Sequence, residues 1–151
     1  MKPDLIWIRL ISAAALGVTL FSSLLLLTPE LTQRGFNIVA FGRTAYPAGF
    51  TPTVIGYLEF VYGVLGAVMI GWMLAVLALI QIPYSRGATW SWWAIVASVL
   101  GWFVIDTTFS LVSGYPGNAV PNAVFLVMFA VPLLATFGIT RNTASNIGNA
   151  P

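Results

Sequence analysis

The chain has 151 residues, of which 59% are hydrophobic and 7% charged, and its mean hydropathy is +0.94. Soluble domains carry about 25% charged residues, so this composition excludes an ordinary water-soluble fold and predicts an integral membrane protein. The sequence has no cysteine and no histidine. This excludes disulfides, a thiolate nucleophile, and zinc or haem sites built on those ligands, and we expect no metal and no cofactor. The net charge of +2 comes from scattered basic residues, which argues against nucleic acid as a partner.

Long stretches without any charged residue indicate where the chain crosses the bilayer. Four such stretches lie at residues 10–29, 60–85, 87–105 and 107–140, the last of them broken by turn-forming residues at 113–118. A helix needs about 20 apolar residues to cross roughly 30 Å of hydrocarbon. We therefore predict an all-α integral membrane protein in which residues 1–151 form a single four-transmembrane-helix bundle. Its helices are placed near 8–28, 55–80, 90–112 and 119–139.

The longest connection, near residues 29–54, joins the first two predicted helices. Its glycines and prolines, among them Gly35, Gly42 and Pro47, divide it into turns. We predict a long outer loop without secondary structure, whose apolar middle at 36–41 rests on the membrane surface or caps the bundle. At the other end of the chain, residues 142–151 are expected to form a mobile polar tail.

The distribution of basic residues predicts the orientation of the bundle. An even number of spans places both termini on one side, together with the second loop. That side carries Lys2, Arg9, Arg86 and Arg141, and the opposite side carries Arg34 and Arg43. By the positive-inside rule, we expect a multi-pass protein of a bacterial-type inner (plasma) membrane with cytoplasmic termini.

Small residues predict how the helices pack. Helices in lipid associate through close contacts and polar interactions, and Gly63, Ala67 and Gly71 recur every four residues along the second helix. This stripe predicts helix packing within the bundle, with dimerisation as the alternative. In the fourth helix, Pro132 removes a backbone hydrogen bond and is expected to produce a kink.

Two acidic residues of the predicted spans need an explanation. Glu59 lies in the first turns of the helix 55–80, and Asp106 follows Trp92 by 14 residues, or about 21 Å at a rise of 1.5 Å per residue. In the predicted orientation, both carboxylates lie in the outer third of the membrane. Charged groups are costly there, so such residues usually face the bundle interior and find partners.

Polar side chains accompany both acids and predict one cluster beneath the outer loop. Ser110 follows Asp106 by one helical turn, and two asparagines open the fourth helix. The predicted cluster contains Glu59, Tyr62, Asp106, Ser110, Asn118 and Asn122, with Arg34 and Arg43 as the nearest candidates for ion pairs.

This cluster has three interpretations. It is a hydrogen-bond and ion-pair network that holds the bundle together, a site that binds a ligand or carries protons, or an acid–base catalytic pair. No nucleophile or metal cluster accompanies the carboxylates, so we assign no catalytic residue.

The leading functional hypothesis is a small polytopic membrane protein that acts as a non-enzymatic accessory, structural or interaction component. The alternative is an oligomeric proton- or cation-coupled transporter that uses Glu59 and Asp106, and a membrane enzyme acting on lipid is a weaker third hypothesis. One copy of four helices encloses little space, so transport would require a dimer. The expected partners are the lipid bilayer and either a second copy of the chain or other membrane subunits.

Overall fold

The fold is given by a computed structural model that describes residues 3–46 and 48–148, with side chains described up to residue 138. Within these residues, every regular element is helical. The α-helices are α1 (Leu5–Leu27), α2 (Pro29–Phe41), α3 (Pro52–Gln81), α4 (Thr89–Val112) and α5 (Ala119–Gly148), and the 3-10 turns are η1 (Tyr84–Arg86) and η2 (Pro116–Asn118). Four segments are long and apolar enough to cross a membrane: Leu5–Leu27, Pro52–Arg86, Thr89–Val112 and Pro116–Gly138. This confirms the predicted all-helical fold with four long apolar helices.

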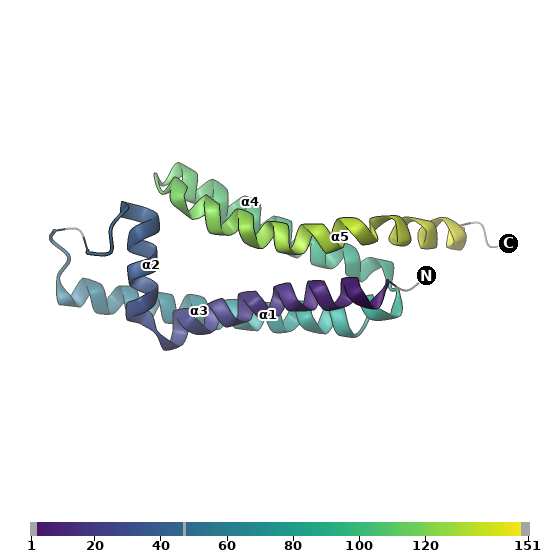
Figure 1. Cartoon of the computed structure of the whole chain (residues 1–151), viewed down its shortest axis with the longest axis horizontal. Coiled ribbons are helices and arrows are strands. Elements are labelled where there is room, and N and C mark those ends of the chain that lie inside the picture. The colour runs from purple at the N-terminus through teal and green to yellow at the C-terminus, as the bar shows by residue number, and fades with distance from the viewer. Residues whose placement is uncertain (1–2, 47, 149–151) are drawn as a thin grey trace.

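The four long helices form two antiparallel pairs. Helix α1 packs along α3, and α4 packs along α5. Figure 1 shows that the two pairs lie close together at the end where α1 begins and α5 ends, and that they diverge toward the end occupied by α2. The first and last helices therefore place both ends of the described chain on the same side of the bundle. Of the basic residues used to predict orientation, Lys2 lies outside the described residues and Arg141 outside the described side chains.

The hydrophobic core lies where the two pairs approach each other. Buried positions recur every three or four residues along α1, as expected of a helix with one face toward its neighbours. The core contains Ile11, Ala14, Ala15 and Val18 of α1, Met73, Val76 and Ile80 of α3, Ile95 and Val99 of α4, and Phe129 and Leu133 of α5. The outer faces are equally apolar and exposed, with Leu20 67%, Ile105 72% and Leu134 70% accessible. Such a surface is typical of contact with lipid.

Hydrogen bonds donated by side chains connect the helices near the hydrophobic core. The hydroxyl of Tyr84 donates to Oγ1 of Thr136 at 2.8 Å, and the indole of Trp72 donates to Oγ of Ser98 at 2.6 Å. The indole of Trp92 donates to the carbonyl of Leu133 at 3.1 Å. The first two bonds join α3 and η1 to α4 and α5, and the third joins α4 to α5 within the second pair.

The region predicted as an unstructured outer loop contains a helix, α2, so that part of the prediction is wrong. Pro29 occupies the first turn of α2, where its missing N–H costs no hydrogen bond, and Glu30 suits the positive end of the helix dipole. Gly42 ends the helix in the left-handed conformation, with φ 67°, and its N–H donates to the carbonyl of Ile38. The proline and glycine that we interpreted as loop residues are therefore the start and stop signals of a helix.

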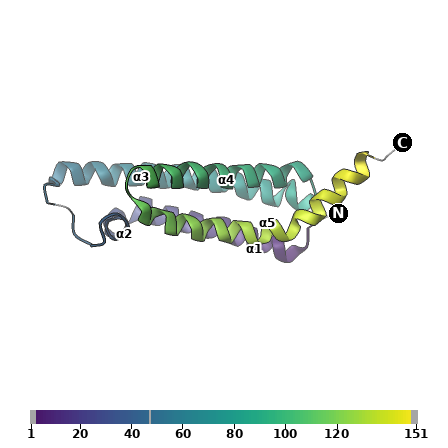
Figure 2. The same ribbon diagram turned by 90° about the horizontal axis from the view of Figure 1, so that it is seen from above.

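Helix α5 is longer than the predicted fourth span. It continues to Gly148, so the predicted tail 142–151 begins inside a helix, and only residues 149–151 lie outside the described part. Pro132 lies within α5 and is buried. Figure 2 shows that the second half of α5 turns away from the line of the first half, as expected for a helix that loses a hydrogen bond and accommodates a proline ring.

Candidate functional site

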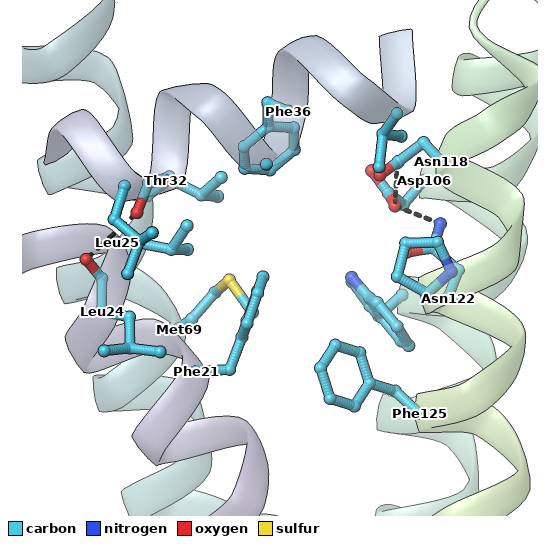
Figure 3. Close-up of a pocket in the computed structure, with 16 residues that line it drawn as sticks. Phe21, Leu24, Leu25, Thr32, Phe36, Met69, Asp106, Asn118, Asn122 and Phe125 are labelled. Atoms are coloured by element: carbon cyan, nitrogen blue, oxygen red, sulfur yellow. Dashed lines mark hydrogen bonds between the residues drawn. The ribbon is translucent and has the colours of Figure 1, made fainter. Parts of the chain in front are cut away.

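The carboxylate of Asp106 is the centre of a hydrogen-bond network between α4 and the start of α5. Its Oδ2 accepts a hydrogen bond from Nδ2 of Asn118 at 3.2 Å and another from Nδ2 of Asn122. Figure 3 shows the two amides converging on the carboxylate from the α5 side. Hydrogen bonds to an ionised acceptor are stronger than those between neutral groups, so the two amides are well suited to hold a carboxylate in this position.

The same amides also bind hydroxyl groups of α4. Nδ2 of Asn118 donates to Oγ of Ser110 at 2.9 Å, and Nδ2 of Asn122 donates to Oγ1 of Thr107 at 3.2 Å. Ser110 in turn donates to the backbone carbonyl of Asp106 at 2.8 Å. Each asparagine therefore uses both of its amide protons, and the network is connected from one helix to the other.

The local sequence explains why these groups meet. Asp106 and Ser110 are one turn apart on α4, and the two asparagines are one turn apart across the start of α5. Between them, Gly114 adopts φ 83°, a conformation that glycine tolerates without strain, and the chain reverses direction through η2. The reversal turns the asparagines toward the carboxylate. The hydrogen bonds of this network therefore join residues that are close together in the sequence.

A cavity of about 410 Å³ lies between the two helix pairs, with α2 across its outer end. This volume is within the range of roughly 300–1,000 Å³ that is usual for small-molecule sites. Asp106, Asn118 and Asn122 form one polar corner, and most of the remaining wall is apolar. The lining residues are Phe21, Leu24, Leu25, Leu31, Thr32, Gly35, Phe36, Val39, Leu65, Met69, Trp102, Asp106, Asn118, Pro121, Asn122 and Phe125.

Helix α2 is held at both of its ends. On one side, Oγ1 of Thr32 donates to the carbonyl of Leu24 at 3.1 Å, and Nε2 of Gln33 donates to the carbonyl of Ile55 at 3.3 Å. On the other side, Gly117 of η2 lies so close to Val39 that an added Cβ would be 2.2 Å from the Val39 carbonyl oxygen. Helix α2 therefore bridges the first helix pair and the turn of the second, above the cavity.

The predicted cluster is divided between two places. The structure brings together Asp106, Ser110, Asn118 and Asn122, but neither Glu59 nor Tyr62 forms a hydrogen bond with them or lines the cavity. Tyr62 instead stacks on Phe36, with ring centroids 4.9 Å apart.

Glu59 is half-buried on α3 and lies near Tyr46 in the segment between α2 and α3. The hydroxyl of Tyr46 is buried and forms no hydrogen bond with the described residues. Burial, with a smaller contribution from the negative charge of Glu59, raises the pKa of Tyr46 above its ordinary value. Arg34 and Arg43 are exposed, and neither forms an ion pair with a described side chain. The carboxylate of Asp106 is likewise without a basic partner among those side chains.

The predicted packing stripe also occupies a different position from the close helix contact. Ala67 is exposed and an added Cβ at Gly71 would have no neighbour within 4 Å, whereas Gly63 faces Leu26 at an ordinary 3.7 Å. The tight approach between α1 and α3 occurs at Gly66, which is buried. Two of the three residues of the predicted stripe, Ala67 and Gly71, are thus exposed.

Sequence reasoning missed the aromatic part of the site. Trp102 precedes Asp106 by four residues and Phe125 follows Asn122 by three, so each shares a helical face with a member of the polar network. That spacing could have identified them as neighbours of the carboxylate. Phe36 could not have been found in this way, because it reaches the cavity from α2, which was not expected to be a helix.

The cavity has the volume and the largely apolar lining that are usual for small-molecule sites. Among the described residues, no group of three or more acidic, histidine or cysteine side chains could hold a metal ion. Comparison with known proteins adds no assignment, because no protein-family model, no curated protein and no solved structure matches the chain. The candidate site is therefore defined by its geometry alone.

Proposed function

We propose that this chain is a small non-enzymatic membrane protein that binds a lipophilic, amphipathic molecule in the cavity beneath α2. The observation that carries the proposal is the combination of a largely apolar cavity of about 410 Å³ with a single carboxylate corner. Ligand sites commonly have this composition, in which apolar walls supply affinity and a few polar groups fix orientation. The set of contacts around Asp106 fits this role, since the network is built from groups that position a carboxylate without neutralising it.

The membrane setting is part of the same proposal. The exposed apolar faces of the four long helices suit a bilayer, and the excess of basic residues on the side of the termini supports cytoplasmic termini in a bacterial-type inner membrane. In this orientation the cavity lies toward the outer leaflet, from which a lipophilic ligand would enter. Ala67 and Gly71 give α3 a smooth exposed face that supports association with a second copy or another membrane subunit.

The transporter alternative has less support. It requires Glu59 and Asp106 to act together, and no hydrogen bond or shared cavity connects the two carboxylates. An enzymatic role has even less support, because among the described residues the carboxylate corner has neither a nucleophile activated by a base nor a metal cluster beside it.

Photolabelling tests the ligand site. The full chain in phosphatidylcholine nanodiscs would be irradiated with decanol that carries a diazirine in its alkyl chain, and the labelled residues would be mapped by mass spectrometry. We expect labels on cavity-lining segments of α2 and α5, and their loss in excess unlabelled decanol. Met69→Trp should remove them, because the Met69 side chain extends into the cavity (Figure 3). Val68→Trp, at a neighbouring position that is 65% exposed, is the matched control. Labels confined to outer faces and insensitive to Met69→Trp would refute the proposal.

A further inference from the structure

The polar corner of the cavity is rich in hydrogen-bond acceptors. The carboxylate of Asp106 accepts two hydrogen bonds, and Oδ2 is the acceptor in both. Its other oxygen, Oδ1, accepts none within the described residues. The amide oxygens of Asn118 and Asn122 also accept none, whereas both protons of each amide are already used. A ligand group at this corner therefore meets unused acceptors, and it must itself be a donor in order to satisfy them.

The corner also carries an uncompensated negative charge. No arginine lines the cavity, and no described basic side chain forms an ion pair. A carboxylate in an apolar environment is costly unless it is paired, and within a membrane such groups usually pair with another charge. A cationic ligand would supply the missing partner.

The walls of the cavity are suited to the same charge. Four aromatic rings line it: Phe21, Phe36, Trp102 and Phe125. Aromatic faces attract cations through their negative π-surfaces, and they also accept an alkyl chain. Among the lining side chains, the indole N–H of Trp102 is the one strong donor that forms no hydrogen bond, so donors available to an anionic ligand are scarce.

We infer that the ligand of this cavity is a lipophilic ammonium, with its N–H groups on Asp106 Oδ1 and the neighbouring amide oxygens, and its apolar chain against the aromatic wall. This inference rests on the proposed function and adds the charge and the donor group of the ligand. The shared chemistry is an ammonium on an alkyl chain, and it can come from a free amine or from the headgroup of an ethanolamine lipid.

Competition experiments test the inference. The diazirine-bearing decanol and a decylamine with the same diazirine would label the chain in phosphatidylcholine nanodiscs at neutral pH, where an alkylamine is protonated. Unlabelled decylamine and decanol would then compete, with each concentration corrected for partitioning into empty nanodiscs. We expect decylamine to compete at about tenfold lower membrane concentration than decanol, the difference that one charge-assisted contact provides. Asp106→Asn should abolish this preference.

Glu59→Gln is the matched control, because it removes a carboxylate of α3 that does not line the cavity; the preference should persist. Thermal melting of both variants would establish that each remains folded. Equal competition by decanol and decylamine, or a preference that survives in folded Asp106→Asn, would overturn the inference while cavity labelling upheld the proposed function. Labelling of the cavity by neither probe would overturn both. Competition by phosphatidylethanolamine added to the nanodiscs would support the inference and identify a lipid headgroup as the source, whereas competition by decylamine alone would support it and identify a free amine.

Discussion

The contact between α1 and α3 at Gly66 provides a sharp test of the packing. A Cβ added at Gly66 would lie 2.6 Å from the backbone oxygen of Ser22, where ordinary contact begins at 3.4 Å, and 3.1 Å from both Leu25 Cβ and Leu26 N. Two of these three neighbours are backbone atoms, which cannot move without moving α1 itself. Gly66→Ala must therefore push the two helices apart along their main interface.

We expect Gly66→Ala to lower the free energy of unfolding by about 1–3 kcal/mol, the usual cost of overpacking a well-packed contact. Gly71→Ala is the matched control on the same helix, because an added methyl there meets nothing within 4 Å. Alanine exceeds glycine in helix propensity by up to about 1 kcal/mol, so this control should be neutral or slightly stabilising. The stripe Gly63, Ala67 and Gly71 predicted from sequence would lead to the opposite ranking.

The assay is equilibrium unfolding in mixed micelles, with dodecyl sulfate as the denaturant and helical circular dichroism as the signal. Both variants and the wild type would be measured in the same micelles, since only differences in unfolding free energy are compared. Equal stability of the two variants, or a larger loss for Gly71→Ala than for Gly66→Ala, would refute the packing of α1 against α3 described above.

Three further predictions concern the site and its surroundings. Gly117→Ala should displace α2, because the new Cβ would overlap the carbonyl of Val39. Hydrogen–deuterium exchange of the α2 amides should then accelerate by about tenfold or more. Gly35→Ala should not accelerate this exchange, because a Cβ added there has no neighbour within 4 Å. Asn122→Ala removes a donor to Asp106 and should lower the unfolding free energy by about 1–3 kcal/mol in the micelle assay. Glu59→Gln should change it by no more than about 0.5 kcal/mol, because the Glu59 carboxylate forms no hydrogen bond with the described residues. Equal effects of the two substitutions would contradict the hydrogen-bond network around Asp106. Tyr46→Phe should be neutral or stabilising at neutral pH, because the hydroxyl is buried without a partner. Since the folded-state pKa of Tyr46 is raised, the wild type should lose stability relative to Tyr46→Phe only as pH rises above the ordinary tyrosine value of about 10, and a loss at lower pH would contradict this reasoning.

The polar network shows which parts of the site were accessible from sequence. Asp106 with Ser110, and Asn118 with Asn122, were predicted together because one-turn spacing and a short reversal leave few other arrangements. Glu59 was assigned to the same cluster from its depth and from the polar and small residues near it on the same helix. Depth along a helix follows from counting residues, but direction around the bundle depends on how α3 is rotated and on where α2 lies. The structure accordingly separates Glu59 from the network that holds Asp106.

Sequence by itself determined that this protein has four long apolar helices, because uninterrupted apolar stretches of about 20 residues have the length and composition of helices that can cross a bilayer. Only the tertiary structure decided that Gly66 forms the close contact, that α2 covers a cavity, and that Asp106 lines it without Glu59. The physical reason is that small and apolar residues cover nearly every face of these helices. Hydropathy therefore does not distinguish lipid-facing from bundle-facing positions, and that choice is made by side-chain packing between segments far apart in the chain.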